Sequence, residues 1–232
     1  MVVVSDILAM IRRGELPLLS ALPSETELCA RFQVSRTRVR EAVKYLQGKG
    51  LLRVEHGRGT WIEPVDHWDL LDAELWTTAL AVGDWKSLVG DLVETRRMLE
   101  TQIVARASVL RSSGELRTLE HDLGEMDNAI QRQNVAEYNG FSRRFHDHLA
   151  IAARNVLLVK FSRSLNNALE LTKQAGHETL DVARLSFRGH QAILDAVRRG
   201  DPTEACEAML HHLSDFGDTL RNQVPSLHRL PP

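Results

Sequence analysis

Two histidines in the last quarter of the chain have a spacing that could bring their side chains together. His190 lies in "GHQAILDAVRRGD", and His212 follows twenty-two residues later in "AMLHHL". Gly200 and Pro202 lie midway between them and predict a turn between two antiparallel helices, so that positions 190 and 212 lie side by side. Converging imidazoles are common ligands of zinc, nickel and similar divalent ions. Histidines that fill a core or face solvent are the alternative, and spacing alone leaves it open.

A second group of residues could bind a polyanion. Residues 35–60 hold seven Lys and Arg residues against two acidic ones, a local charge of +5. The whole chain of 232 residues carries a net charge of −2, so the remainder carries −7. This asymmetry favours a small surface for nucleic acid and a larger body that avoids it. The alternative is an ordinary solvated helix face.

Helix start signals indicate how the basic segment is positioned. Residues 5–13 predict a short helix with Ser5 as its N-cap. Ser24 and Glu27 have the spacing of a capping box, which predicts a second helix over residues 25–32. Both helices precede the basic segment.

The basic segment itself predicts one helix and a hairpin. Ser35 is the expected N-cap of a helix that Gly48 and Gly50 end. The stretch "LLRVEHGRGTWIEP" then alternates around "HGRG", which predicts two short strands joined by a tight turn. Helix, helix, turn, helix, hairpin is the order of a winged helix-turn-helix. The residues expected to face base edges and phosphates are Ser35, Arg36, Thr37, Arg38 and Arg40 on the helix, with His56, Gly57 and Arg58 on the wing.

Beyond Pro64 the pattern is helical throughout. An aromatic helix with Trp68 and Trp76 is expected in a linker over residues 65–84. Further helices are predicted over roughly 85–112, 114–133, 135–153, 155–175, 179–199 and 202–222, with a break near Gly176. The predicted fold is therefore mostly α, with an N-terminal winged helix-turn-helix and β-hairpin wing over 1–64 and a C-terminal all-α bundle of six or seven helices over 85–232.

Cysteine usage and the first residues indicate the compartment. Cys29 and Cys206 lie far apart inside helical patterns, without the spacing of a disulfide framework or a zinc ribbon. The apolar opening is too short to span a bilayer, and Arg12 and Arg13 follow it instead of preceding it as in a signal peptide. We expect a cytoplasmic protein with no membrane anchor.

Residues 22–64 resemble the winged-helix half of the GntR family of bacterial transcription regulators. The resemblance is carried by "LPSE", by "VSRTRVREA" and by the wing "GRGT". It implies DNA contacts at Arg36, Arg38, Arg40, His56, Gly57 and Arg58, with Thr37 close to them. Thr26 stands where some relatives have a phosphate-contacting arginine, so that contact is not expected here.

The second half resembles the FCD effector domain of the FadR subfamily, in "LVETRRMLE", "FHDHLAIAARN" and "GHQAILDAVRRGD". The resemblance implies a metal held by His146, His190 and His212, together with an aspartate one turn before the first histidine. Ser142 stands at that position, so we expect zinc or nickel to bind more weakly than in relatives. His148 and His211 are expected to face outward.

The same resemblance assigns an effector. Arg96 in "ETRRMLE" matches an arginine that grips a small carboxylate in the metal cavity, which would also include Ser142. A surface ion pair with Glu100 is the alternative role for Arg96. The stretch "HWDLLDAELW" resembles a segment of galactonate-type regulators and favours a hydroxylated acid.

The expected function is a dimeric repressor of transcription that binds a palindromic, double-stranded DNA operator and responds to a small organic acid. Two alternatives stay open. One is a regulator with a metal-free pocket for a lipid-like or other ligand. The other is a metal-dependent hydrolase, against which the sequence shows no HExxH motif and no evident buried general base.

Overall fold

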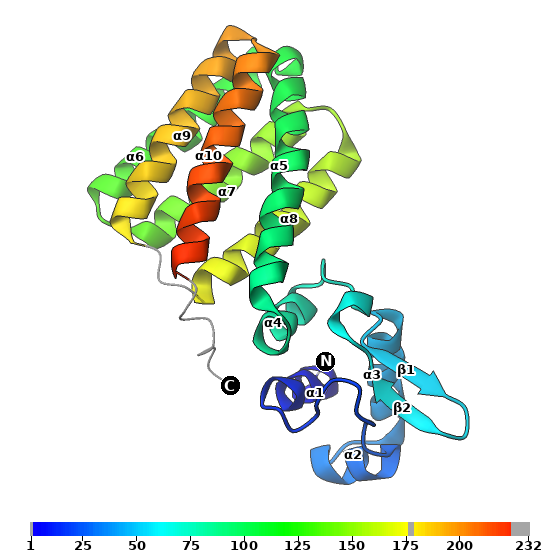
Figure 1. Cartoon of the computed structure of the whole chain (residues 1–232). Helices are drawn as coiled ribbons and strands as arrows, with labels where there is room; N and C mark the ends of the chain where they lie inside the picture. Colours follow the sequence, from blue (N-terminus) through cyan, green and yellow to red (C-terminus); the bar gives the residue numbers. More distant parts are fainter. Residues whose placement is uncertain (1, 176–178, 224–232) are drawn as a thin grey trace. The chain divides into compact units, whose positions relative to one another are not determined.

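The computed structural model describes residues 2–175 and 179–223 (Figure 1). The chain forms two compact units, one running to Leu88 and the other beginning at Val89, within the first turns of a long helix. The predicted break near Gly176 and the predicted end of the second domain at residue 232 lie outside the described residues.

The first unit is a winged helix-turn-helix, as predicted. Its elements are α1 (Val2–Arg12), α2 (Glu25–Phe32), α3 (Arg36–Gly48), β1 (Leu52–Glu55) and β2 (Gly59–Ile62). The two strands are antiparallel, and the hairpin projects beside α3 (Figure 1). Ile7, Leu28, Val39, Leu46 and Ile62 are all fully buried in one core, so the helices and the wing are fixed to one another.

The start of α1 differs from the prediction. The helix begins at Val2, so Ser5 lies inside it and is not its N-cap. Val3 and Val4 are buried in the same core as Ile7. Burial of these two valines stabilises an extra helical turn, and this tertiary contribution outweighs the local preference of serine for a cap position.

The predicted caps of the next two helices are confirmed. Ser24 Oγ accepts from the Glu27 backbone N at 3.3 Å, while Glu27 Oε2 accepts from the Ser24 backbone N at 2.8 Å, which completes the capping box of α2. Ser35 Oγ accepts from the backbone N of Arg38 at 3.5 Å and caps α3. The cap of α3 thus fixes where the basic residues begin.

The linker segment is less helical than predicted. A short 3-10 turn (η1, Val65–His67) precedes α4 (Ala73–Val82), and Trp68 lies between the two instead of inside a helix. Its indole Nε1 donates to the carbonyl of Glu63 at 2.9 Å, and the ring is buried. This buried hydrogen bond holds the chain in an extended form there, because a buried indole N–H needs a partner.

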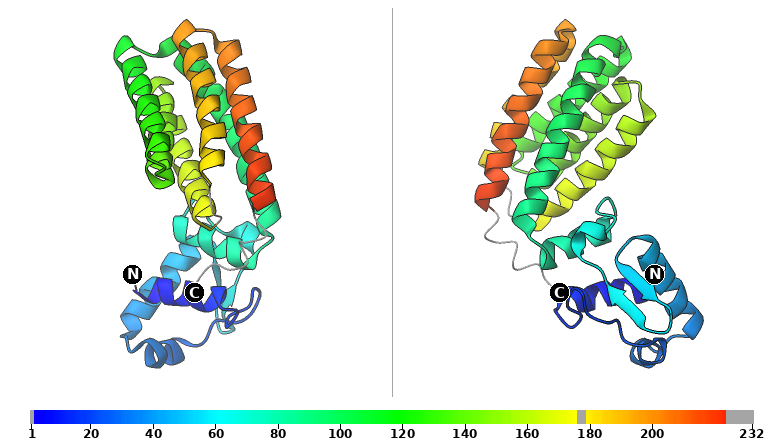
Figure 2. Two further views of the ribbon diagram at one scale, coloured as in Figure 1. Left: turned by 90° about the vertical axis from the view of Figure 1, so that its left-hand side faces the viewer. Right: turned by 45° about the vertical axis from the view of Figure 1, so that its right-hand side comes forward.

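The second unit is an all-α bundle, as predicted. Within the described residues it contains α5 (Trp85–Leu110), α6 (Ser113–Gln131), α7 (Val135–Ala152), α8 (Val156–Ala175), α9 (Leu180–Arg199) and α10 (Pro202–Gln223). Figure 2 shows these six helices lying alongside one another. Gly200, with φ of 76°, ends α9 and forms the turn into α10. None of the helices in the described part of the chain is long and apolar enough to cross a membrane.

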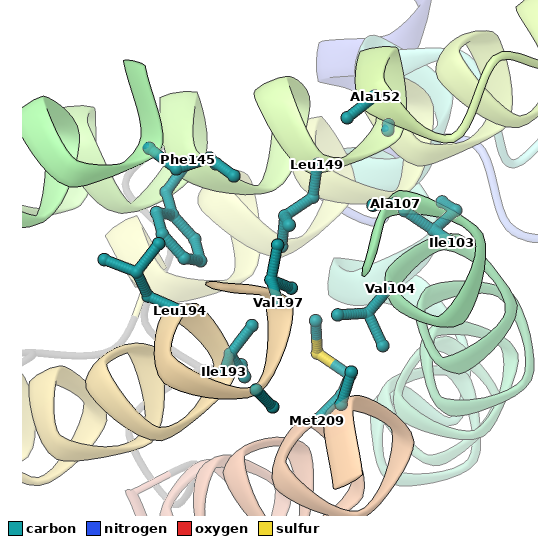
Figure 3. Close-up of a cluster of buried hydrophobic side chains, with 14 of the residues drawn as sticks. Ile103, Val104, Ala107, Phe145, Leu149, Ala152, Ile193, Leu194, Val197 and Met209 are labelled. Carbon is teal, nitrogen blue, oxygen red and sulfur yellow. The ribbon is translucent and has the colours of Figure 1, made fainter. Parts of the chain in front are cut away.

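The core of this bundle is formed by buried residues of α5, α6, α7, α9 and α10. Four of these helices, α5, α7, α9 and α10, also carry the three histidines, Arg96 and Glu100. Val104, Leu149, Ile193, Val197 and Met209 point toward one another in Figure 3, and all are buried. Alanines at several buried positions let the helices approach closely. This apolar layer lies next to the polar site described below, since the same four helices supply both.

Candidate functional site

Three buried histidines from three helices lie together in the bundle. His146 belongs to α7, His190 to α9 and His212 to α10, and each is at most 5% exposed. One nitrogen of each ring lies within 4.8 Å of those of the other two. The rings of His190 and His212 have centroids 4.3 Å apart. The turn at Gly200 therefore brings positions 190 and 212 side by side.

The close approach of α9 and α10 depends on a glycine beside His190. A Cβ atom built on Gly189 would lie 2.4 Å from His212 Nδ1 and 3.0 Å from its Cβ. Any side chain at position 189 would therefore displace His212. The sequence analysis did not single out Gly189, although a glycine inside a helix next to a candidate ligand is a signal of close packing.

Hydrogen bonding defines which ring nitrogens face the centre. His146 Nδ1 lies 2.6 Å from Glu100 Oε2, in a close contact without good hydrogen-bond alignment. His190 Nδ1 lies 2.8 Å from the carbonyl oxygen of Ser186. Tyr138 Oη also lies 3.4 Å from His190 Nδ1. Because Glu100 Oε2 and Ser186 O are acceptors, they favour the tautomer with hydrogen on Nδ1, in which Nε2 has a lone pair.

The Nε2 atoms of His146 and His190 face each other. His146 Nε2 and His190 Nε2 are 3.2 Å apart in a buried environment. Two lone pairs at this distance repel unless a proton or a cation lies between them. His212 Nδ1 is also buried and has no hydrogen-bond partner among the described residues. This donor set fits a divalent metal, because neutral imidazoles with inward-facing lone pairs are its ordinary ligands.

The protonation states agree with this arrangement. Burial lowers the pKa of His212 well below its usual value, and the neighbouring His190 and His146 lower it further, so His212 is a neutral imidazole. Burial alone would raise the pKa of Glu100, but Arg96 and His146 outweigh it and hold that pKa below its usual range. Glu100 is therefore a buried carboxylate.

Arg96 forms the ion pair considered from the sequence and also lies at the wall of the cavity. Its guanidinium Nε donates to Glu100 Oε1 at 2.7 Å, so the ion pair exists. The pair is buried, however, with Arg96 only 3% exposed, and so differs from the surface pair considered as the alternative role. Arg96 also lines a cavity of about 30 Å³ with Ser142, His146 and His212. Arg96 was predicted from the sequence as a site residue, whereas Glu100 was considered only as a surface partner and is in fact a buried carboxylate of the site.

The serine at the expected ligand position lies within the same site. Ser142 is buried, and its Oγ is 3.2 Å from His190 Nε2. Asn139, Asn166 and Ser186 also line the cavity, although the sequence analysis did not predict them. Arg143 and Glu170 line it as well, so the wall is mainly polar and charged, which suits a polar ligand.

The two neighbouring histidines differ from each other. His211 is exposed, as expected. His148 is half-buried, and its Nδ1 contacts Asp122 Oδ2 at 2.5 Å, so the expectation that it faces outward is wrong. Asp122 on α6 is fully buried and also contacts Arg144 at 3.2 Å. A buried carboxylate requires such partners, and only the packing of α6 on α7 supplies them.

The basic residues of the first unit lie on one helix start and on the wing. Ser35, Arg36, Thr37, Arg38 and Arg40 are exposed, while Val39 between them is fully buried. Arg40 Nε contacts the Glu25 carboxylate at 2.8 Å in an exposed ion pair of small energy. The turn between β1 and β2 exposes His56, Gly57 and Arg58, and Gly57 there has φ of 75°.

A cationic winged helix-turn-helix and a polar site in a separate helical unit define a class of protein, the transcription regulators with a sensing domain. Residues 2–62 match the family described as "Bacterial regulatory proteins, gntR family", and residues 91–215 match the FCD domain. The chain therefore belongs to the GntR family, among the members that carry an FCD domain.

Individual relatives agree with this assignment. The HTH-type transcriptional regulator LutR of Bacillus subtilis is 30% identical over 91% of this chain and 96% of its own length. The galactonate operon transcriptional repressor of Escherichia coli K12 is 29% identical over 82% of this chain and 83% of its own. A solved GntR structure from Streptococcus agalactiae superimposes with a TM-score of 0.55 at 25% identity, covering 94% of this chain and 98% of that one.

Proposed function

We propose that this regulator is a cytoplasmic, homodimeric repressor whose affinity for a palindromic operator is set by a small hydroxylated acid in the helical domain. The observation that carries the proposal is the cluster of three buried imidazoles, two of which, His146 and His212, line one polar cavity together with Arg96. The relative named as a galactonate operon repressor supports a hydroxylated acid as the effector. An arginine fork and a divalent metal together suit the carboxylate of such an acid.

On the DNA side, residues 1–64 are the proposed binding domain and residues 65–84 the linker. The exposed residues at the start of α3 would enter the major groove, and the wing would contact the phosphate backbone. A dimer is expected because two symmetry-related helices read the two halves of a palindrome. The proposed effector and dimerisation domain covers residues 85–232.

The proposed metal is zinc or nickel, held by His146, His190 and His212. When bound, it would act as a Lewis acid that polarises an oxygen of the ligand. The protein supplies three buried imidazoles, two of which have Nδ1 beside an acceptor oxygen. Ser142 adds no negative charge to the site, so the metal should be removed more readily by chelators than in a site with a fourth, anionic ligand.

Binding of an acid should require movement. The cavity of about 30 Å³ has room for an ion and very little solvent, far less than the several hundred Å³ typical of ligand pockets. An acid must therefore displace side chains or separate helices. Such differential binding between two arrangements of the domain is what a ligand needs to change affinity for DNA.

The two alternatives receive less support. An acyl chain would need an apolar pocket, whereas the cavity wall is mainly polar, with Leu169 as its one apolar member among the described residues. For a hydrolase, Glu100 is a buried carboxylate near the histidines, but both its oxygens are in contact with Arg96 or His146. It is therefore poorly placed to take a proton from water. Both relatives described above are named as transcriptional regulators.

The test is a titration of DNA binding. An operator is first obtained by in vitro selection from random duplexes, and its affinity is measured by fluorescence anisotropy with hexonates, short dicarboxylates and fatty acids, each with and without zinc or nickel. We expect one hydroxylated acid to change operator affinity by about 5- to 150-fold, the usual range of allosteric coupling. Sedimentation of the free protein measures the dimer.

Two variants locate the response. Arg96→Lys retains the positive charge beside Glu100 but loses the planar fork, so operator binding should be unchanged while the acid response is lost. Arg97→Lys is the matched control, because the neighbouring Arg97 is exposed. A full response in Arg96→Lys would place the effector elsewhere. A response to fatty acids alone, or turnover of an acid, would favour one of the two alternatives.

A further inference from the structure

Glu100 is a buried carboxylate on α5 that belongs neither to the three-histidine set nor to the proposed acid ligands. We infer that Glu100 is a positioning residue for the metal: it fixes His146 with Nε2 toward the centre and supplies the negative charge that Ser142 does not. This inference rests on the proposed metal site. It concerns this chain's own side chains and can be tested without an effector.

The contacts of Glu100 divide between its two oxygens. Oε1 accepts from Arg96 Nε at 2.7 Å, and Oε2 lies 2.6 Å from His146 Nδ1. Glu100 itself is 2% exposed. Arg96 lies one helical turn away on α5 and thus anchors the carboxylate, while the other oxygen reaches across to α7. Glu170 on α8 also lines the cavity, and Glu100 is in direct contact with His146.

The chemistry of a metal-bound histidine makes this contact important. A carboxylate at the second ring nitrogen fixes the tautomer and the ring orientation, and it makes the ligating nitrogen more basic. It also compensates part of the metal's charge in a buried site, where unpaired charge is costly. A hard anionic ligand at position 142 would do this directly. In this chain the negative charge belongs to Glu100, which contacts the proposed ligand His146 and is not itself a proposed ligand.

The sharpest perturbation is Glu100→Gln, because it keeps the shape and removes one acceptor. Arg96 and His146 Nδ1–H are both donors, whereas a glutamine amide offers a single acceptor oxygen and a donor NH₂ group. One of the two partners must then lose its contact. Asp122→Asn is the matched control, since Asp122 is a fully buried carboxylate that contacts His148 on the same helix as His146.

The experiment measures zinc affinity of the full-length, metal-stripped protein by competition with a chromophoric chelator. Glu100→Gln should bind zinc about 10- to 100-fold more weakly than wild type, the range found for outer-shell partners of metal ligands. Asp122→Asn should lower the midpoint of thermal unfolding but leave zinc affinity unchanged. Both variants lose a buried charge, so the comparison separates metal positioning from general destabilisation.

A second measurement requires no variant at position 100. In the metal-free wild-type protein, ¹⁵N chemical shifts of the histidine rings should show His146 as the Nδ1–H tautomer, with assignment from His146→Gln. An Nε2–H tautomer, or unchanged zinc affinity in Glu100→Gln, would overturn the inference and leave the metal proposal intact. A wild-type protein that binds no zinc or nickel would remove the metal proposal, and the inference with it.

Discussion

Gly189 offers the most direct test of how the bundle brings its histidines together. It lies inside α9 beside His190, and a Cβ at this position would lie 2.4 Å from His212 Nδ1. Ordinary contact requires about 3.5 Å or more. Gly189→Ala must therefore move His212 away by about 1 Å, several times the tolerance of about 0.2 Å on metal–ligand distances.

The expected energies separate two effects. Alanine gains about 1 kcal/mol of helix propensity over glycine, while overpacking costs about 1–3 kcal/mol. The net loss of stability of Gly189→Ala should therefore be small, from about zero to 2 kcal/mol. Zinc affinity should fall much more than stability, since His212 would leave the ligand set.

The assay pairs chemical denaturation with zinc competition on the same samples. Gly124→Ala in α6 is the matched control, because a Cβ there meets nothing within 4 Å and the residue is exposed. It should gain stability and bind zinc as wild type does. If Gly189→Ala binds zinc like wild type, α10 can shift without consequence, and the close approach is not what holds His212 in the site.

Four further predictions concern both units. Arg36→Ala and Arg40→Ala should each cost about 1–3 kcal/mol of operator affinity in a gel-shift titration at fixed salt, and unchanged binding in both would contradict the assignment of α3. Arg58→Ala should make the slope of log affinity against log salt shallower by about one, whereas an identical slope would place Arg58 away from the phosphates. Ser142→Asp should strengthen zinc binding in the chelator competition, and a failure to do so would mean that the ligand geometry inferred from the family does not apply here. Ser112→Ala removes the N-cap of α6 and should lower the free energy of unfolding by about 1 kcal/mol, with no loss meaning that the capping box is unimportant.

Much of the fold could be predicted because its signals are local. The capping box of Ser24 and Glu27 lies within four residues, and so does the cap at Ser35 that fixes the start of α3. The turn at Gly200 needs a left-handed residue, which glycine adopts without steric cost. From that turn the spacing of His190 and His212 follows by helix geometry alone, because equal numbers of helical residues on both sides bring the two positions level.

Tertiary structure decided what lies beside these elements. Ser5 lies inside α1 because burial of Val3 and Val4 in the core stabilises an additional helical turn before it. His148 was drawn inward by Asp122 on another helix, and Arg96 with Glu100 became a buried pair that reaches His146 on α7. Helical periodicity states which face of a helix is apolar, but not which helix will cover it. The environment of a charged side chain depends on that neighbour, and burial in a medium of low dielectric then determines which charges must pair.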